Sequence, residues 1–280
     1  MTGEAMRIDA HQHFWRLDRG DYGWLTPDLA PIYRDFLPGD LAPHLSEAGI
    51  GGTILVQAAP SSAETDFLLG LARDDARILG VVGWVDFEAA DAPDRIARLA
   101  RMPKLAGLRP MIQDIAQDDW MLRPDLRPAF EALIAEDLVF DALTLPRHLP
   151  FLRRLIARHP EMRVVIDHAS KPDIRTGAFE GWASDMAALA RETQAFCKLS
   201  GLVTEAAPDW SVGDLRPYVD HLLSVFGPDR LIWGSDWPVC TLAASYGEWD
   251  AATAALLSDL DDGARAAILG GTAARVYLRR

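Results

Sequence analysis

Eight short apolar segments, separated by longer stretches, are the sequence feature that most limits how this chain can fold. Apolar runs of four to eight residues that are rich in β-branched side chains are typical of buried strands. The expected strands are residues 6–10, 52–57, 78–85, 105–109, 138–143, 163–168, 196–201 and 231–236. Most of their starts are about 25–35 residues apart, which is enough for one strand, one helix and two loops.

The stretches between these strands favour helices. Five of them have an amphipathic pattern: residues 91–101, 127–136, 149–158, 182–193 and 215–226. Strands and helices that alternate eight times predict an α/β fold, a (β/α)8 TIM barrel that forms a single domain over residues 1–280. A doubly wound open sheet is the alternative, but its glycine-rich phosphate loop is missing after the first strand. Residues 261–280 are expected to form a helix that closes the barrel.

Composition restricts the partners and the compartment. The chain has 280 residues, of which 49% are hydrophobic, and this is enough for one large core. A net charge of −13 argues against nucleic-acid and membrane partners. Two cysteines, Cys197 and Cys240, indicate neither a disulfide framework nor a thiolate zinc site. The sequence has neither a signal-peptide pattern nor a membrane-span pattern, so we expect a cytoplasmic protein. The sequence does not decide whether the chain forms a homo-oligomer.

The first expected strand leads into a pair of histidines. Alternate side chains of a strand share a face, so Asp9, His11 and His13 are expected to point the same way. The two imidazoles would lie about 7 Å apart on one wall. Such a pair can hold a metal ion or polarise a substrate oxygen. The alternative is two structural histidines that are satisfied by hydrogen bonds.

Polar side chains concentrate where the expected strands end. In (β/α)8 barrels the catalytic residues lie at the carboxyl ends of the strands. The polar residues at or just after these ends include His11, His13, Gln57, Arg109, Asp141, His168 and Asp236. One ionisable residue at a strand end is common, but several on one ring predict an active site. Residues 14–38, the longest gap, carry Trp15 and Trp24 and predict either a lid or simple packing over the mouth.

Several motifs, taken in this order, resemble the amidohydrolase superfamily and more narrowly its amidohydrolase 2 lactonase branch. They are His11-Gln12-His13-Phe14-Trp15, Tyr22-Gly23-Trp24-Leu25, Gly107-Leu108-Arg109, Asp167-His168 with Lys171-Pro172, and Trp233-Gly234-Ser235-Asp236-Trp237-Pro238. The resemblance covers nearly the whole chain. That branch includes L-fuconolactonase, L-rhamnonolactonase and pyrone-dicarboxylate lactonase.

The resemblance implies a hydrolase of carbohydrate metabolism that opens a sugar-acid lactone, such as L-fucono- or L-rhamnonolactone, to the free acid. Asp236 would activate water, and His11, His13 and His168 would polarise the scissile carbonyl. The residue types suit this chemistry, because ester hydrolysis needs a base for water and an electrophile for the oxyanion. The structural alternatives are a turn-capping role for Asp236 and a buried structural role for His168.

The resemblance also bears on metal content. Binuclear members of the superfamily carry a lysine at strand four, where this chain has Arg109, and many mononuclear members carry a histidine at strand five, where it has Asp141. We therefore expect either no strictly required cofactor or a single divalent ion, with zinc favoured, on His11, His13 and Asp236.

Substrate contacts are expected from six residues around the predicted mouth: Arg109, Lys171, Gln57, Asp141, Trp15 and Trp24. The alternatives are a structural salt bridge for Arg109, a solvated loop position for Lys171 and a helix cap for Asp141. A metal-dependent decarboxylase of the same superfamily is a rival function, which the missing strand-five histidine disfavours. A hydrolase of a dicarboxylate lactone and an inert binding barrel are further alternatives.

Overall fold

The computed structural model describes residues 6–278, which form a ring of eight parallel strands. The strands pair in sequential order: β1 (Ile8–Gln12), β2 (Gly52–Val56), β3 (Ile78–Gly83), β4 (Leu105–Leu108), β5 (Val139–Ala142), β6 (Val164–Ile166), β7 (Phe196–Leu199) and β8 (Leu231–Trp233). Backbone hydrogen bonds from Asp236 N to His11 O (2.7 Å) and from His13 N to Trp237 O (2.8 Å) join the segment after β8 to β1. The predicted (β/α)8 barrel is confirmed.

All eight expected strands are present, but all except the first end one to three residues earlier than the sequence predicts, and this matters most for two of them. The sixth and eighth were expected to reach His168 and Asp236, whereas β6 ends at Ile166 and β8 ends at Trp233. Both residues have a positive φ, 51° for His168 and 58° for Asp236, which is incompatible with an extended strand. The chain therefore leaves the sheet just before these two side chains and turns into the barrel mouth.

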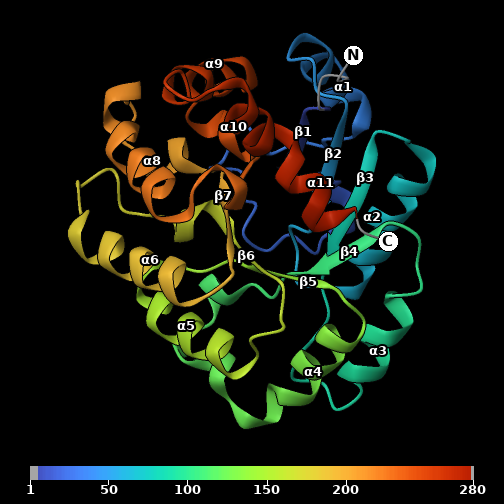
Figure 1. The fold of residues 1–280 in the computed structure, drawn as a ribbon. Helices are drawn as coiled ribbons and strands as arrows, with labels where there is room; N and C mark the ends of the chain where they lie inside the picture. The colour runs from blue at the N-terminus through green and yellow to red at the C-terminus, as the bar shows by residue number, and fades with distance from the viewer. Residues whose placement is uncertain (1–5, 279–280) are drawn as a thin grey trace.

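Helices surround the ring of strands (Figure 1). Their bounds are α1 (Pro38–Glu47), α2 (Ser62–Asp74), α3 (Ala92–Leu99), α4 (Arg127–Ala135), α5 (Leu149–Arg158), α6 (Glu180–Glu192), α7 (Leu202–Glu205), α8 (Val212–Phe226) and α9 (Tyr246–Leu256). The five predicted helical stretches correspond to α3, α4, α5, α6 and α8. Local caps fix some starts: Ser245 accepts from the Glu248 N–H at α9, and the Glu248 side chain accepts from the Ser245 N–H.

The tail closes the barrel as predicted, but not as one helix. It consists of α10 (Asp262–Ala266), a π-helical turn (Ala267–Gly271) and α11 (Thr272–Tyr277). The break lies at Gly270, where a Cβ atom would lie only 2.1 Å from the Met6 carbonyl oxygen. Figure 1 shows α11 across the middle of the ring. Ala273, Val276 and Tyr277 of α11 pack against inward-facing side chains of the strands and close one end of the barrel.

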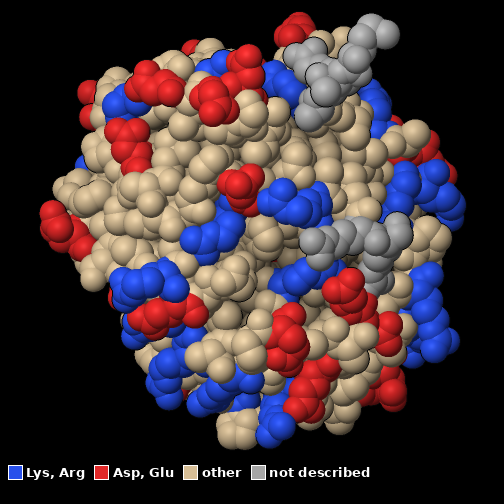
Figure 2. Space-filling view, in the orientation of Figure 1, with Lys and Arg blue, Asp and Glu red and all other residues tan. Residues whose placement is uncertain are grey.

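Figure 2 shows acidic and basic side chains of both signs spread over the face that it presents, with uncharged residues between them. Within residues 6–278, no helix has the length and apolar character needed to cross a membrane.

Candidate active site

A cavity of about 220 Å³ lies at the carboxyl ends of the strands. Its lining residues come from loops that follow six different strands: His13, Trp24, Leu29, Ala58, Arg109, Met111, Gln113, Leu143, His168, Lys171, Asp236, Val239 and Leu242. Cavities for drug-sized molecules usually measure about 300–1,000 Å³. This cavity therefore suits a smaller ligand, and its place at the mouth is where this fold carries out chemistry.

Asp236 lies at the centre of three imidazoles. Its Oδ1 atom is 3.2 Å from His13 Nε2, 3.7 Å from His11 Nε2 and 3.9 Å from His168 Nε2. All four side chains are buried. The structure thus brings together the four residues that the sequence singled out for catalysis, from three segments of which the first and last are 223 positions apart.

An unusual backbone turn carries His168 to this point. Residues 168–171 all have positive φ values (51°, 50°, 60° and 51°), although none of them is glycine. Left-handed backbone costs L-residues roughly 1–2 kcal/mol each, so tertiary contacts must hold the turn. Two such contacts are Trp182 Nε1 donating to the Ala169 carbonyl (2.7 Å) and the Thr144–Ser170 hydroxyl pair (2.8 Å). The turn brings both His168 and Lys171 to the cavity wall.

Burial and mutual charge set the protonation states in the site. Burial lowers the pKa of His168 to about 4 and holds the pKa of His11 well below its ordinary value, to which Lys198 also contributes. Burial by itself would raise the pKa of Asp236, but the facing His168, His13 and His11 outweigh it and keep that pKa below 3.8. At neutral pH the site therefore combines one carboxylate base with neutral His11 and His168 rings.

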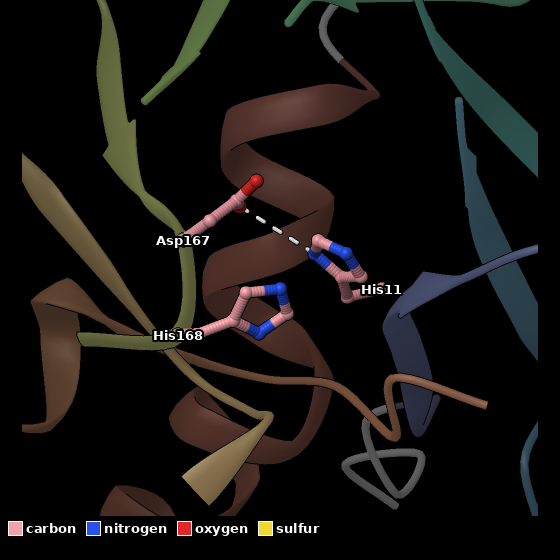
Figure 3. Close-up of side chains that lie close together, drawn as sticks. All are labelled: His11, Asp167 and His168. Atoms are coloured by element: carbon pink, nitrogen blue, oxygen red, sulfur yellow. Dashed lines mark ion pairs between the residues drawn. The ribbon is translucent and has the colours of Figure 1, made fainter. Parts of the chain in front are cut away.

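A cluster of buried charged residues packs next to His11 inside the barrel. Lys198 of β7 is fully buried, and its Nζ lies 2.5 Å from Asp141 Oδ2 and 2.9 Å from Asp167 Oδ1. Arg109 Nη1 also pairs with Asp167, at 3.1 Å. Figure 3 shows Asp167 and His168 facing His11 across the barrel, with the ion pair between Asp167 and His11 marked.

Sequence reasoning missed both Lys198 and Asp167 as site residues. The available clue to Lys198 was one lysine inside an otherwise apolar run, Phe196-Cys197-Lys198-Leu199, at a position that alternates inward. It also missed cavity-lining residues that follow strands four, five and eight or lie in the first long loop: Leu29, Met111, Gln113, Leu143, Val239 and Leu242.

Of the six residues expected to contact substrate, three line the cavity: Arg109, Lys171 and Trp24. The other three lie outside the lining set that the described part of the chain provides. Gln57 Nε2 donates to the Arg109 carbonyl (2.7 Å), and Asp141 binds Lys198. Trp15 is fully buried and donates from Nε1 to the Arg34 carbonyl (2.7 Å), so it supports the wall instead of forming it.

The expected alignment of Asp9 with the two histidines is wrong. The register between β1 and β2 shifts between Asp9 and Gln12, so the simple alternation of a strand fails there. The Asp9 carboxylate accepts from the Ser235 N–H (2.8 Å) and from the Tyr246 hydroxyl of α9 (3.1 Å). The His11 and His13 rings lie closer together than predicted, with 4.9 Å between their centroids.

The loop between β1 and α1 packs against the barrel and also forms part of the cavity wall. Trp24 lines the cavity and donates from Nε1 to the Ala58 carbonyl (2.7 Å). The Tyr22 hydroxyl donates to the buried Glu64 carboxyl (2.5 Å), whose other oxygen accepts from the Ala58 N–H (2.9 Å). Glu64 therefore fastens the loop to the start of α2.

Glu64 should make the stability of the protein depend on pH. Burial raises the pKa of Glu64 from 4.5 to about 7. A carboxyl whose pKa is raised on folding contributes stability below its unfolded value and loses it as pH rises through the folded value. Relative to Glu64→Gln, the wild-type free energy of unfolding should therefore fall by roughly 3 kcal/mol between about pH 4.5 and 7. Urea unfolding of both proteins across this range measures the difference, and a constant difference would contradict the assignment.

The site residues fit one divalent ion. Ligand atoms of His11, His13 and Asp236 all lie within 4.8 Å of one another, as do those of His11, Asp167 and His168. Two imidazoles with one carboxylate are a common donor set of catalytic zinc sites. The His13 ring is oriented for such a role, because the Val56 carbonyl, 2.8 Å from Nδ1, holds the ring with Nε2 toward Asp236.

Comparison with known proteins agrees with this architecture. Residues 8–279 match the amidohydrolase family. An L-fucono-1,5-lactonase from Burkholderia ambifaria is 47% identical over 277 residues, which cover 98% of this chain and 96% of that protein. A crystal structure of an amidohydrolase from Burkholderia multivorans with bound zinc is 42% identical, covers 98% of this chain and 99% of that one, and has a TM-score of 0.92.

A more distant structure shows the same fold. It is a probable 2-pyrone-4,6-dicarboxylic acid hydrolase from Acinetobacter baumannii, 18% identical over 96% of this chain and 98% of that one, with a TM-score of 0.82. The match along nearly the whole chain and the shared barrel lead to one conclusion: this chain belongs to the amidohydrolase family.

Proposed function

We propose that this lactone-hydrolysing enzyme opens a sugar-acid lactone to the free acid, with L-fucono-1,5-lactone as the first candidate substrate. The observation that carries the proposal is the Asp236 carboxylate, held among three imidazoles in a small cavity. The relatives that cover nearly the whole chain carry the name L-fucono-1,5-lactonase, which supports this choice of lactone.

Asp236 acts as the base in this proposal. It takes a proton from water, and His13 Nε2 lies beside it, 3.2 Å from Asp236 Oδ1. The resulting hydroxide attacks the lactone carbonyl carbon. His11 and His168 polarise the carbonyl oxygen and stabilise the negative charge that develops there. When the ring carbon–oxygen bond breaks, Asp236 returns the proton to the leaving alkoxide.

The cavity wall offers both kinds of contact that such a substrate needs. Arg109, Gln113 and Lys171 present polar groups for ring hydroxyls. Leu143 and Val239 are among the apolar lining residues, which suit the carbon face and the methyl group of a deoxysugar lactone.

A lactone panel tests the substrate class. We expect L-fucono-1,5-lactone to be hydrolysed with a kcat/KM about 10³-fold or more above that of an unsubstituted six-membered lactone, because hydroxyl-binding groups left unpaired in a buried site are costly. Proton release followed with a pH indicator measures the rates. Equal or faster hydrolysis of long-chain alkyl lactones would contradict the proposal.

Metal content is a separate prediction. A zinc ion would be held by His11, His13 and Asp236, and when bound it would supply Lewis-acid polarisation of the substrate or of water. His11 belongs to both candidate ligand groups, so we expect at most one ion per chain. Elemental analysis of the purified protein measures this number. Two equivalents per chain, with activity that follows both, would contradict the prediction.

A further inference from the structure

Four residues beside the cavity form a closed ring of hydrogen bonds. The Glu64 carboxylate of α2 accepts from the Tyr22 hydroxyl with one oxygen (2.5 Å) and from the Ala58 N–H with the other (2.9 Å). The Ala58 carbonyl in turn accepts from Trp24 Nε1 (2.7 Å). Tyr22 and Trp24 are two positions apart in the loop between β1 and α1, so the backbone of this loop completes the hydrogen-bond ring.

The hydrogen-bond ring joins the cavity wall to a side chain outside it. Trp24 and Ala58 line the cavity, whereas Glu64 is fully buried and lies outside the lining set of the described residues. Each of its carboxylate oxygens pairs with one donor. An apolar side chain at residue 64 would leave both donors unpaired, which is costly in a buried place. The position of this part of the wall therefore depends on Glu64.

Other contacts of the loop do not replace the hydrogen-bond ring. Arg19 pairs with Asp21 (2.6 Å), and Asp21 accepts from the Ser61 hydroxyl (2.7 Å), so these residues hold an earlier part of the loop. Trp24 also meets the Trp15 indole edge-on, with 5.6 Å between centroids. Apolar packing is not directional, whereas the hydrogen bond from its N–H fixes which way the Trp24 indole points.

We propose that Glu64 is a positioning residue for substrate binding: through Ala58 it holds Trp24 in the conformation that binds the lactone, and so it affects KM and not kcat. The consequence for KM rests on the proposed lactone hydrolysis, whereas the hold on Trp24 does not. Substrate binds only those molecules whose wall is in place, so the apparent affinity falls in proportion to that fraction. Once substrate is bound, the reacting groups are the same, so kcat is unchanged.

Hydrogen exchange of the Trp24 indole tests the hold on Trp24 without any substrate. The indole N–H signal of ¹⁵N-labelled protein is assigned by its loss in Trp24→Phe. In Glu64→Leu we expect this proton to exchange with deuterated solvent about tenfold faster or more, because the Ala58 carbonyl is no longer held in place for it. An unchanged exchange rate would overturn the proposal, whether or not the protein hydrolyses lactones.

Steady-state kinetics on L-fucono-1,5-lactone test the consequence for binding. In Glu64→Leu we expect KM to rise about tenfold while kcat stays within about twofold of wild type. Glu64→Gln should restore most of the loss, since its amide oxygen can accept from the Ala58 N–H and its amide nitrogen can donate to the Tyr22 oxygen. A fall in kcat with KM unchanged would overturn the proposal.

Thr65→Val is the matched control, because Thr65 is the next residue of α2 and is also buried. The Thr65 hydroxyl accepts from the Trp84 N–H (2.8 Å) and donates to the Trp84 carbonyl (3.0 Å). The control variant therefore loses hydrogen bonds of the same helix but none of the hydrogen-bond ring. Its KM and its Trp24 exchange rate should match those of wild type. Equal changes in Thr65→Val and Glu64→Leu would point to lost stability as the cause and overturn the proposal.

A double variant tests whether Glu64 acts through Trp24. Trp24→Phe keeps an aromatic side chain but has no N–H for the Ala58 carbonyl. In the Trp24→Phe background, Glu64→Leu should change KM by less than about twofold, whereas independent effects would multiply. A rise of about tenfold in both backgrounds would overturn the proposal. If Glu64→Leu does not fold, Tyr22→Phe replaces it in every comparison with the same expected results, because it opens the hydrogen-bond ring and leaves Glu64 paired with Ala58.

Discussion

Asp236→Asn is expected to lower kcat for lactone hydrolysis by about 10²-fold or more, because an amide cannot accept the proton of the attacking water. The fold should remain, since Asn has nearly the same shape and its amide group can either donate to or accept from His13 Nε2, which lies 3.2 Å from Asp236 Oδ1. Steady-state rates on L-fucono-1,5-lactone, with circular dichroism as a check on folding, measure the effect.

Asp66→Asn is the matched control for this experiment. Asp66 is exposed on α2, and the same change of side chain there should leave kcat unaltered. Wild-type turnover by a folded Asp236→Asn protein would remove Asp236 from the role of base.

Gly234→Ala should have the second-largest effect, through the position of His11. A Cβ atom at residue 234 would lie 2.6 Å from His11 Cβ and 2.9 Å from His11 N. The clash involves the backbone of β1, so relief requires His11 and its strand to move. Misplacement of a catalytic group by about 1 Å can cost 10²-fold in rate, and overpacking typically costs about 1–3 kcal/mol of stability. We expect losses of this size in kcat/KM and in the free energy of unfolding.

Gly247→Ala is the control for the glycine experiment. Gly247 lies in the first turn of α9, and among the described residues an added Cβ there meets no heavy atom within 4 Å. Alanine favours helix over glycine by roughly 0.5–1 kcal/mol, so this variant should be slightly more stable and fully active. Equal activity of the two alanine variants would show that the contact at Gly234 does not position His11.

The surroundings of each titratable side chain in the site, more than its residue type, set its pKa. The pKa of His168 falls to about 4 because the ring is buried, while Asp236 stays ionised because the imidazoles around it outweigh the cost of burying its charge. Asp141, also buried and beside Lys198 and Asp167, has its pKa raised to about 6. Two buried carboxyl groups of one barrel thus have pKa values shifted in opposite directions.

The sequence by itself determined the barrel and the mouth. Strand and helix periodicities are local, so eight apolar runs with amphipathic stretches between them were enough to predict β1 to β8 and most of the outer helices. The carboxyl ends of parallel strands meet at one end of a barrel. This rule alone was sufficient to place His13, Arg109, His168 and Asp236 on the same cavity.

Tertiary structure alone decided how these side chains are held. Lys198 contacts His11 from 187 positions away, and a single lysine in an apolar run gives no local indication of its partners. The left-handed turn at residues 168–171 contains no glycine, so turn chemistry did not predict it, and contacts from Trp182 and Thr144 hold it. Asp9 turned toward α9 because the register of β1 shifts. In each case the deciding energy comes from contacts between distant segments, which exist only after the chain has folded.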